Sequence, residues 1–211
     1  MQEILNLLFS QFNGYTPLLL TLELTAIFFG LFSVIFSARN SILVYPTGLV
    51  STAIYVYLLL RADLYGDLII NAYYFYMSIY GWLLWSRKDN RDSLTITFAN
   101  KKDNVKSGVI FVVSVIFVSG VYHYFGMFTF WWAYVDTFIT GLFFVGMWLL
   151  AKRKLENWIY LIIGDIIGIP LFFYKGLVFT GFFYIILTII AIFGYRAWKK
   201  TLQNNKPIYS T

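Results

Sequence analysis

The sequence contains no cysteine, a single histidine and little charge. Of its 211 residues, only 12% are Asp, Glu, Lys or Arg, about half the share of an ordinary soluble domain. The lack of cysteine excludes disulfides, thiolate catalysis and Cys-ligated metal, and the lone His123 argues against a His-based metal site. We therefore expect neither a metal nor a cofactor. The paired acid–base groups that an intramembrane enzyme would need are missing as well.

What the chain has instead is apolar surface. It is 60% hydrophobic and 22% aromatic, with a mean hydropathy of +0.71. Lipid is the expected surrounding for such a composition. The net charge of +6 does not indicate a nucleic-acid partner, because the basic residues lie in short clusters between long apolar runs. The composition therefore predicts an integral membrane protein.

Seven apolar segments have about the length, roughly 20 residues, at which a helix crosses the hydrocarbon core. They are Thr16–Ser37, Ile42–Leu60, Gly66–Ser86, Ser107–Phe125, Trp131–Ala151, Asn157–Tyr174 and Leu177–Trp198. Around them we expect an interfacial N-terminal segment at residues 1–15, a cytoplasmic loop at 87–106 and a cytoplasmic tail at 199–211. Residues 1–10 lack the basic region and the cleavage site of a signal peptide.

The basic residues predict the orientation of the chain. If the N-terminus lies outside, 14 of the 16 Lys and Arg residues fall on the inner side, and only Arg61 and Lys175 fall outside. Inner loops of membrane proteins carry such an excess of positive charge. We therefore expect a multi-pass protein of the plasma membrane (the inner membrane in a bacterium), with its N-terminus outside and its C-terminus in the cytoplasm.

A single ungapped shift of the sequence, here called the repeat shift, aligns the first three spans with the last three. It pairs Glu23 with Asp136, Arg39 with Lys152, Tyr45 with Trp158, Thr52 with Asp165, Asn71 with Tyr184, Gly81 with Gly194, Trp82 with Tyr195 and Trp85 with Trp198. Three spans leave the chain on the side of the membrane opposite to the one where it started. One further span is needed to bring it back, so that both triplets of helices cross the membrane in the same direction. The prediction is an all-α integral membrane fold of seven helices, in which parallel three-helix repeats at residues 16–86 and 131–198 are joined by a linker helix at 107–125. A substrate cavity is expected near the midplane between the repeats.

Three acidic residues lie within the predicted spans, where an ionisable group needs a partner or a wet cavity. Asp165 is near the middle of its span, and we place it in the cavity; the alternative is a satisfied hydrogen bond between helices. Glu23 and Asp136 hold matched positions nearer the outer side. For these two we favour a structural or gating role over contact with the substrate.

Polar and aromatic side chains form a stripe on each repeat's last helix. Asn71, Tyr74 and Ser78 are spaced i, i+3 and i+7, and Tyr184 and Thr188 are spaced i and i+4. Hydroxyl and amide groups suit the edges of a sugar or a heterocycle and require no charge. We expect both stripes to line the cavity.

The repeat adds further candidates near the inner side. Trp158 and its counterpart Tyr45 either belong to the interfacial aromatic belt or provide rings that stack on the substrate or close an inner gate. Thr52, the counterpart of Asp165, is assigned to the substrate site. A structural or gating role is assigned to the Gly-aromatic-x-x-Trp residues, namely Trp82, Trp85, Tyr195 and Trp198.

Two sequence motifs carry a family resemblance. The chain resembles the PnuC-type vitamin transporters from about Glu23 to Lys200. In the first half the resemblance rests on Asn71-Ala-Tyr-Tyr74 followed by Ser78-Ile-Tyr-Gly81-Trp82-Leu-Leu-Trp85. In the second half it rests on Lys154-Leu-Glu156-Asn157-Trp158, Asp165 and Gly194-Tyr195-Arg196-Ala197-Trp198. The resemblance implies a fold related to SWEET sugar transporters, a homotrimer, and facilitated diffusion of nicotinamide riboside with capture by cytoplasmic phosphorylation. It implies substrate contacts at Asn71, Tyr74, Trp158, Asp165 and Tyr184.

The sequence departs from the family pattern at three of the motif positions. The family often has glutamine at position 71 and tryptophan at positions 45 and 195, where this chain has Asn71, Tyr45 and Tyr195. Similar proteins carry thiamine, riboflavin or deoxynucleosides, so thiamine is the alternative cargo. A membrane scaffold without transport is the alternative from another class, in which the polar stripes only join helices.

Overall fold

The computed structural model describes residues 14–62, 65–87, 94–126, 128 and 130–204. Within this part the chain forms seven α-helices and no sheet. They are α2 (Pro17–Ala38), α3 (Val44–Arg61), α4 (Tyr65–Trp85), α5 (Lys101–Tyr124), α6 (Trp132–Ala151), α7 (Asn157–Tyr174) and α8 (Val178–Asn204). This confirms the predicted all-α fold of seven helices. The expected interfacial segment at 1–15 lies almost wholly outside the described residues, as does the end of the tail from residue 205.

Five of these helices, namely α2, α5, α6, α7 and α8, are long and apolar enough to cross a membrane. The remaining two, α3 and α4, are of similar length at 18 and 21 residues. They are richer in tyrosine and in small polar residues, which lowers their mean hydropathy. Membrane helices that carry such residues direct them to a bundle interior or a wet cavity.

Two helices extend beyond the predicted spans. α5 begins at Lys101 rather than Ser107, because Asn100 and Asp103 form a capping box at its start. In it Asp103 N donates to Asn100 Oδ1 at 2.9 Å, and Asn100 N donates to Asp103 Oδ2 at 3.1 Å. α8 continues past Trp198 to Asn204, so part of the predicted tail is helical.

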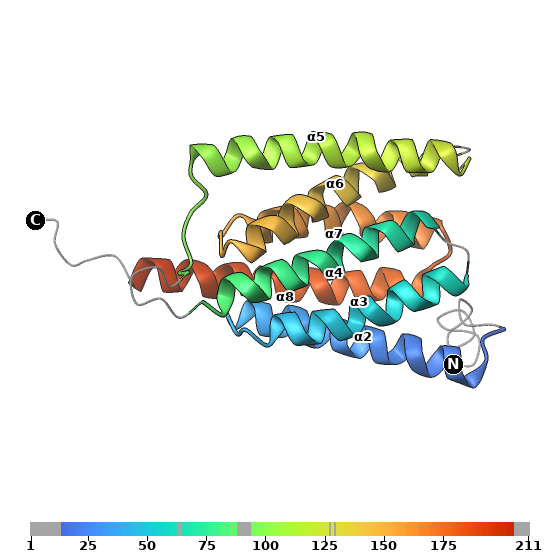
Figure 1. Cartoon of the computed structure of the whole chain (residues 1–211), viewed down its shortest axis with the longest axis horizontal. Coiled ribbons are helices and arrows are strands. Elements are labelled where there is room, and N and C mark those ends of the chain that lie inside the picture. The colour runs from blue at the N-terminus through green and yellow to red at the C-terminus, as the bar shows by residue number, and fades with distance from the viewer. Residues whose placement is uncertain (1–13, 63–64, 88–93, 127, 129, 205–211) are drawn as a thin grey trace, which may run out of the picture.

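Six helices form a closed ring, and α5 lies outside it (Figure 1). Around the ring α2 packs against α3, α3 against α4, α4 against α6, α6 against α7, α7 against α8, and α8 against α2. Under the repeat shift α2 corresponds to α6 and α4 to α8. The two repeats contact each other through α2 with α8 and through α4 with α6, and the repeat shift turns each of these two contacts into the other. This is the arrangement expected of two repeats around an axis that runs along the helices.

The backbone repeats the same turn at the same shift. Asn40 and Arg153, which the repeat shift pairs, are the non-glycine residues with positive φ in the described chain, at 53° and 51°. Their N–H groups donate to Ser37 O and Leu150 O, both at 2.9 Å. The repeat shift pairs these two acceptors as well. The duplication inferred from sequence thus extends to individual backbone hydrogen bonds.

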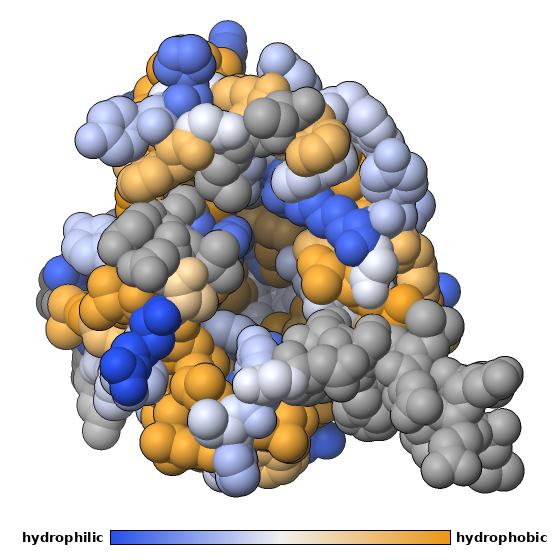
Figure 2. Space-filling model, turned by 90° about the vertical axis from the view of Figure 1, so that its right-hand side faces the viewer, coloured by the Kyte–Doolittle hydropathy of each residue, from blue (hydrophilic) through white to orange (hydrophobic). Residues whose placement is uncertain are grey.

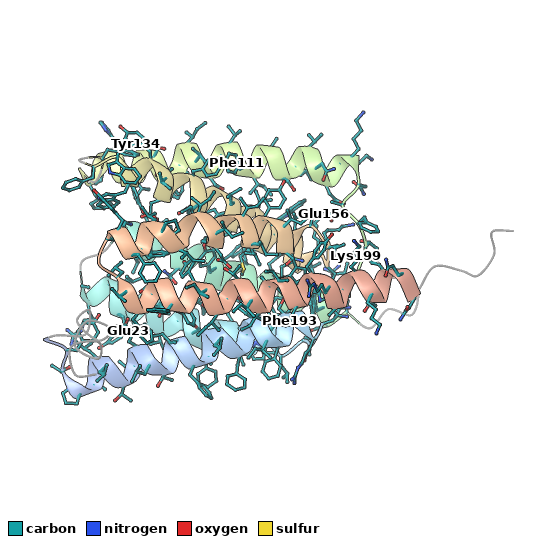
Figure 3. The ribbon with its side chains drawn as sticks, turned by 180° about the vertical axis from the view of Figure 1, so that it is seen from behind. Glu23, Phe111, Tyr134, Glu156, Phe193 and Lys199 are labelled. Carbon is teal, nitrogen blue, oxygen red and sulfur yellow. The ribbon has the colours of Figure 1, made fainter. Side chains whose placement is uncertain are left out.

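The two ends of the bundle differ in chemistry. We call the end that carries the α2–α3 turn, the α6–α7 turn and residues 94–100 the basic end, after Arg39, Arg153 and Lys154. The opposite end, which carries Glu23, Asp67, Asp136 and Lys175, is the cavity end. Figure 3 shows Glu23 and Tyr134 at the cavity end and Glu156 and Lys199 at the basic end.

Residues 94–100, here called the strap, tie α5 to the α6–α7 turn. Thr97 N donates to Arg153 O at 3.1 Å, and Thr97 O accepts from Leu155 N at 3.0 Å. Lys154 Nζ donates to Thr97 Oγ1 at 3.0 Å and lies 3.2 Å from Asp103 Oδ2. No described residue makes such contacts with the matching α2–α3 turn, so the strap belongs to the second repeat alone.

Candidate functional site

A cavity of about 900 Å³ opens at the cavity end, on the axis between the repeats. Figure 2, which looks onto this end, shows the molecule hollowed at its centre. Both repeats and α5 contribute polar side chains to the lining, namely Glu23, Tyr55, Asp67, Asn71, Tyr74, Tyr122, Asp136, Thr140, Lys175, Thr180 and Tyr184. The volume lies within the range of about 300–1,000 Å³ that is usual for small-molecule sites.

The floor of this cavity is aromatic. Tyr74 of α4 and Tyr184 of α8 line the large cavity and also a smaller one, of about 160 Å³, that continues toward the basic end. Asp165 of α7 lines the small cavity and not the large one. The two tyrosines therefore stand between the open cavity and the Asp165 carboxylate, and Asp165 itself is 5% exposed.

The mouth of the cavity is acidic. Among the lining residues Glu23, Asp67 and Asp136 are acidic, and Lys175 is the single basic one. Asp136 Oδ2 lies 2.9 Å from Lys175 Nζ and accepts from Tyr122 Oη at 3.4 Å. With all four groups ionised the lining has an excess of negative charge, which raises the local concentration of cations.

Glu23, the repeat counterpart of Asp136, has a different partner. Its carboxylate is hydrogen-bonded by the phenol of Tyr15, which precedes α2. Partial burial, followed by the hydrogen bond and the charge of Glu23, raises the pKa of Tyr15 to about 12. The phenol therefore stays neutral, and it brings no positive charge to Glu23 of the kind that Lys175 brings to Asp136.

The basic end is closed by four large rings. Tyr45 and Trp85 meet edge to face at 5.1 Å between ring centroids, and their counterparts Trp158 and Trp198 do so at 5.6 Å. Trp85 and Trp198 also touch each other, at 6.3 Å. We call these four residues the aromatic seal. Trp158 is fully buried, and Trp198 is 1% exposed.

Two glycines make this packing possible. A Cβ at Gly194 would lie 2.6 Å from Trp158 Cζ2, and a Cβ at Gly81 would overlap the ring of Tyr45. The rings can therefore close against the backbones of α4 and α8 only because position 81 and position 194 carry no side chain. Each copy of the Gly-aromatic-x-x-Trp motif therefore serves the seal twice. Its glycine gives the flat helix surface on which one ring packs, and its tryptophan is another of the rings.

Comparison with known proteins identifies the family of the chain. The model of the nicotinamide mononucleotide transporter family matches residues 20–200, which is most of the chain. The chain belongs to this family. It is therefore a PnuC-type, multi-pass membrane transporter, in agreement with the resemblance found in the sequence motifs.

Individual relatives agree with the family assignment. The nicotinamide riboside transporter PnuC of Escherichia coli (strain K12) is 25% identical over 197 residues, which cover 80% of this chain and 81% of that protein. The riboflavin/roseoflavin transporter RibM of Streptomyces davaonensis is 25% identical over 139 residues, 63% of each chain. The crystal structure of the vitamin B3 transporter PnuC superposes with a TM-score of 0.66 at 19% identity, over 88% of this chain and 83% of that one.

Against this family fold, the expected substrate residues fall into three groups. Asn71, Tyr74 and Tyr184 line the large cavity, and Asp165 lines the small one. Tyr45 and Trp158 lie in the aromatic seal instead of the cavity wall. The third group uses its hydroxyls within its own helices and is absent from both linings: Thr52 donates to Gly48 O, Ser78 to Tyr74 O and Thr188 to Tyr184 O.

The residues expected to be structural or gating also separate. Trp85 and Trp198 belong to the seal, and Tyr195 packs against the same core from its edge. Trp82 is 42% exposed on the outside of the bundle. Glu23 and Asp136 line the cavity mouth.

Several residues of the cavity lining were not predicted from the sequence, namely Tyr55, Asp67, Tyr122, Trp132, Thr140, Lys175 and Thr180. In the sequence Lys175 is a basic residue of an outer loop, and Tyr122 belongs to the linker helix outside both repeats, so neither stood out as a site residue. The sequence held one clue to Asp67 and Lys175. Both lie next to the ends of predicted spans, and those helix ends enclose the mouth of the cavity. No group of three or more His, Asp or Glu side chains that could hold a metal occurs among the described residues.

Proposed function

We propose that this chain carries nicotinamide riboside across the plasma membrane by alternating access, with thiamine or another B vitamin as the alternative cargo. The observation that carries the proposal is the cavity between the two repeats, open at one end and closed at the other by the aromatic seal. A carrier needs such a site with access from one side at a time. Family membership supports transport, and the name of the Escherichia coli relative supports this cargo.

The chemistry of the cavity suits a cationic aromatic ring attached to a sugar. Tyrosine rings at Tyr74 and Tyr184 and the acids at the mouth would attract a pyridinium or a thiazolium. The Asn71 side chain, whose amide donates to Asp67 O at 3.0 Å, has an oxygen to offer a sugar hydroxyl. Riboflavin, which the name of the Streptomyces relative attaches to that protein, is uncharged and would gain less from the acids.

The proposed cycle alternates between two closures. The repeats rock about their shared axis, so the cavity end narrows around the cargo while the tyrosine floor and the aromatic seal part. The cargo then passes through the small cavity beside Asp165 toward the basic end. No coupled ion is included, and phosphorylation of the riboside in the cytoplasm would keep the product inside. The N-terminus is placed outside, which puts the seal, the strap and most of the basic residues on the cytoplasmic side. A homotrimer is proposed from the family resemblance.

Uptake into proteoliposomes tests the proposal. The purified protein is reconstituted, and labelled nicotinamide riboside, thiamine and riboflavin are supplied in parallel. Saturable uptake of nicotinamide riboside, with exchange against unlabelled riboside preloaded in the lumen, is the expected result. Saturable uptake of thiamine alone would favour the alternative cargo. The absence of flux for all three, together with the absence of binding, would contradict the proposal and favour a scaffold.

A further inference from the structure

The contacts of Lys175 point to a ligand site in the cavity wall. Its ammonium lies 2.9 Å from Asp136 Oδ2 and also stands over the ring of Trp132, 4.2 Å from the ring centroid. The Phe172 ring is 5.8 Å away on another side. A carboxylate with flanking aromatic faces is the arrangement by which proteins bind organic cations.

All four residues line the cavity from which a substrate would approach. Lys175 directly follows α7 and precedes Gly176, which adopts a positive φ of 76° in the turn to α8. The lysine ammonium is carried on a flexible four-carbon stem. It can therefore leave the site without movement of the helices, whereas Asp136 and Trp132 are fixed on α6.

The first repeat shows that this arrangement is not a simple product of the duplication. Under the repeat shift Glu23 corresponds to Asp136, but the positions of the two rings and of the lysine are apolar. They are Leu19 for Trp132, Leu59 for Phe172 and Ala62 for Lys175. One side of the mouth therefore has a carboxylate with two rings and an ammonium, and the other side has a carboxylate hydrogen-bonded by the Tyr15 phenol, with aliphatic side chains at the positions of those rings and that ammonium.

We propose that Asp136, Trp132 and Phe172 form a cation site for the charged ring of the cargo, and that Lys175 holds this site until a positively charged heteroaromatic ring displaces it. The inference rests on the proposed function and deepens it. One carboxylate cannot serve two cations at contact distance without repulsion between them. Lys175 is thus a tethered competitor, and it lowers affinity for cationic cargo while leaving neutral cargo almost untouched.

The difference between the two sides of the mouth also predicts how the cargo is oriented when it binds. A molecule with one charged ring and one neutral sugar would place the ring at α6 of the second repeat. Its sugar would then face Asn71 of α4. The preference for a ring with a permanent positive charge comes from Asp136, Trp132 and Phe172, and Lys175 weakens that preference because the ring must first displace the ammonium from Asp136.

The test compares nicotinamide riboside with its reduced form, which has the same ribose but an uncharged dihydropyridine ring. Binding of each to the purified full-length protein is measured by titration calorimetry. Lys175→Met should tighten binding of the cationic form about two- to fivefold and leave the reduced form within about twofold. Trp132→Leu should weaken the cationic form about two- to fivefold and again spare the reduced form.

Arg61→Met is the matched control. It also removes one positive charge from the cavity end, but Arg61 is exposed, stands over Tyr57 and does not line the cavity. It should change neither affinity. Opposite effects of the Lys175 and Trp132 variants on the cation alone support the inference, and a folded-protein check by size-exclusion chromatography accompanies each variant.

Two outcomes would overturn it. If Lys175→Met weakens the cationic form, leaves it unchanged or shifts both forms equally, the lysine is a structural or direct binding group and not a competitor. Should wild-type protein bind and transport nicotinamide riboside normally in that case, the proposed function stands and only this inference fails. If wild-type protein binds neither form, the proposed function fails, and this inference fails with it.

Discussion

Trp85 and Trp198, which hold equivalent positions in the two repeats, each donate their indole N–H to the backbone of the other repeat. Trp85 Nε1 donates to Ala151 O at 3.1 Å, at the end of α6, and Trp198 Nε1 donates to Ser37 O at 3.0 Å, near the end of α2. The third helix of each repeat is thereby fastened to the first helix of the other. These reciprocal bonds hold the basic end closed in this structure, and they must break if the repeats are to part there.

The first prediction concerns these two bonds. Trp85→Phe and Trp198→Phe each keep an aromatic ring in the seal but remove the donor. Each should cost the closed arrangement about 0.5–1.5 kcal/mol, and the cost of the double variant should differ from the sum of the two, because the rings touch each other. Thermal unfolding in detergent measures the effect. Trp82→Phe, on the outer surface, is the control, and an equal loss in that variant would contradict a special role for the seal.

The second prediction concerns the glycines beneath the rings. Gly81→Ala and Gly194→Ala place a methyl group against Tyr45 and Trp158, which are too buried to move aside. Each should destabilise the protein by about 1–3 kcal/mol. Gly108→Ala and Gly120→Ala in α5, where nothing lies within 4 Å of the added Cβ, should be neutral or slightly stabilising. A similar loss of melting temperature in all four variants would mean that the close packing seen here does not matter.

The third prediction separates binding from passage. Asp165 lies beyond the tyrosine floor, so Asp165→Asn should leave affinity for nicotinamide riboside at the cavity end within about threefold. The rate of transport should fall by at least about tenfold, because the variant removes the only carboxylate among the described residues that line the small cavity. Calorimetry and initial uptake rates in proteoliposomes give the two values. A large loss of affinity with an unchanged maximal rate would instead place Asp165 in the initial binding site.

The fourth prediction concerns the strap. Asp103→Asn weakens both the capping box of α5 and the ion pair with Lys154, so it should cost about 0.5–2 kcal/mol of stability. Thermal unfolding in detergent again measures the loss. The control is Lys102→Met, at an exposed position in the first turn of the same helix, which should cost nothing measurable. If the two variants unfold alike, the strap contributes nothing to the second repeat.

Much of the fold could be predicted from the sequence, because its causes are local. Lipid requires about 20 apolar residues per span, and the repeat shift followed from landmarks such as Gly81 and Gly194. The start of α5 was misplaced, since hydropathy does not register a capping box formed by Asn100 and Asp103 ahead of the apolar run.

The site was harder to predict, because it depends on which side chains meet across helices. Asn71, Tyr74 and Tyr184 were found from helical spacing, which keeps them on one face. The position of Trp158 in the seal follows from its contact with Gly194, on a different helix. Lys175 resembles an ordinary loop charge until α6 brings Asp136 and Trp132 beside it.

The reactivity of one introduced cysteine tests most directly whether the cavity is open at one end and closed at the other. The natural chain has none, so Asn71→Cys in the large cavity can be labelled without background by a membrane-impermeant maleimide, in vesicles of either orientation. We expect rapid labelling from the outer side, protection by nicotinamide riboside, and slow labelling from the cytoplasmic side that rises when Trp85→Phe and Trp198→Phe are added. Equal labelling from both sides, unaffected by the riboside and by the seal, would contradict a carrier with a closed basic end.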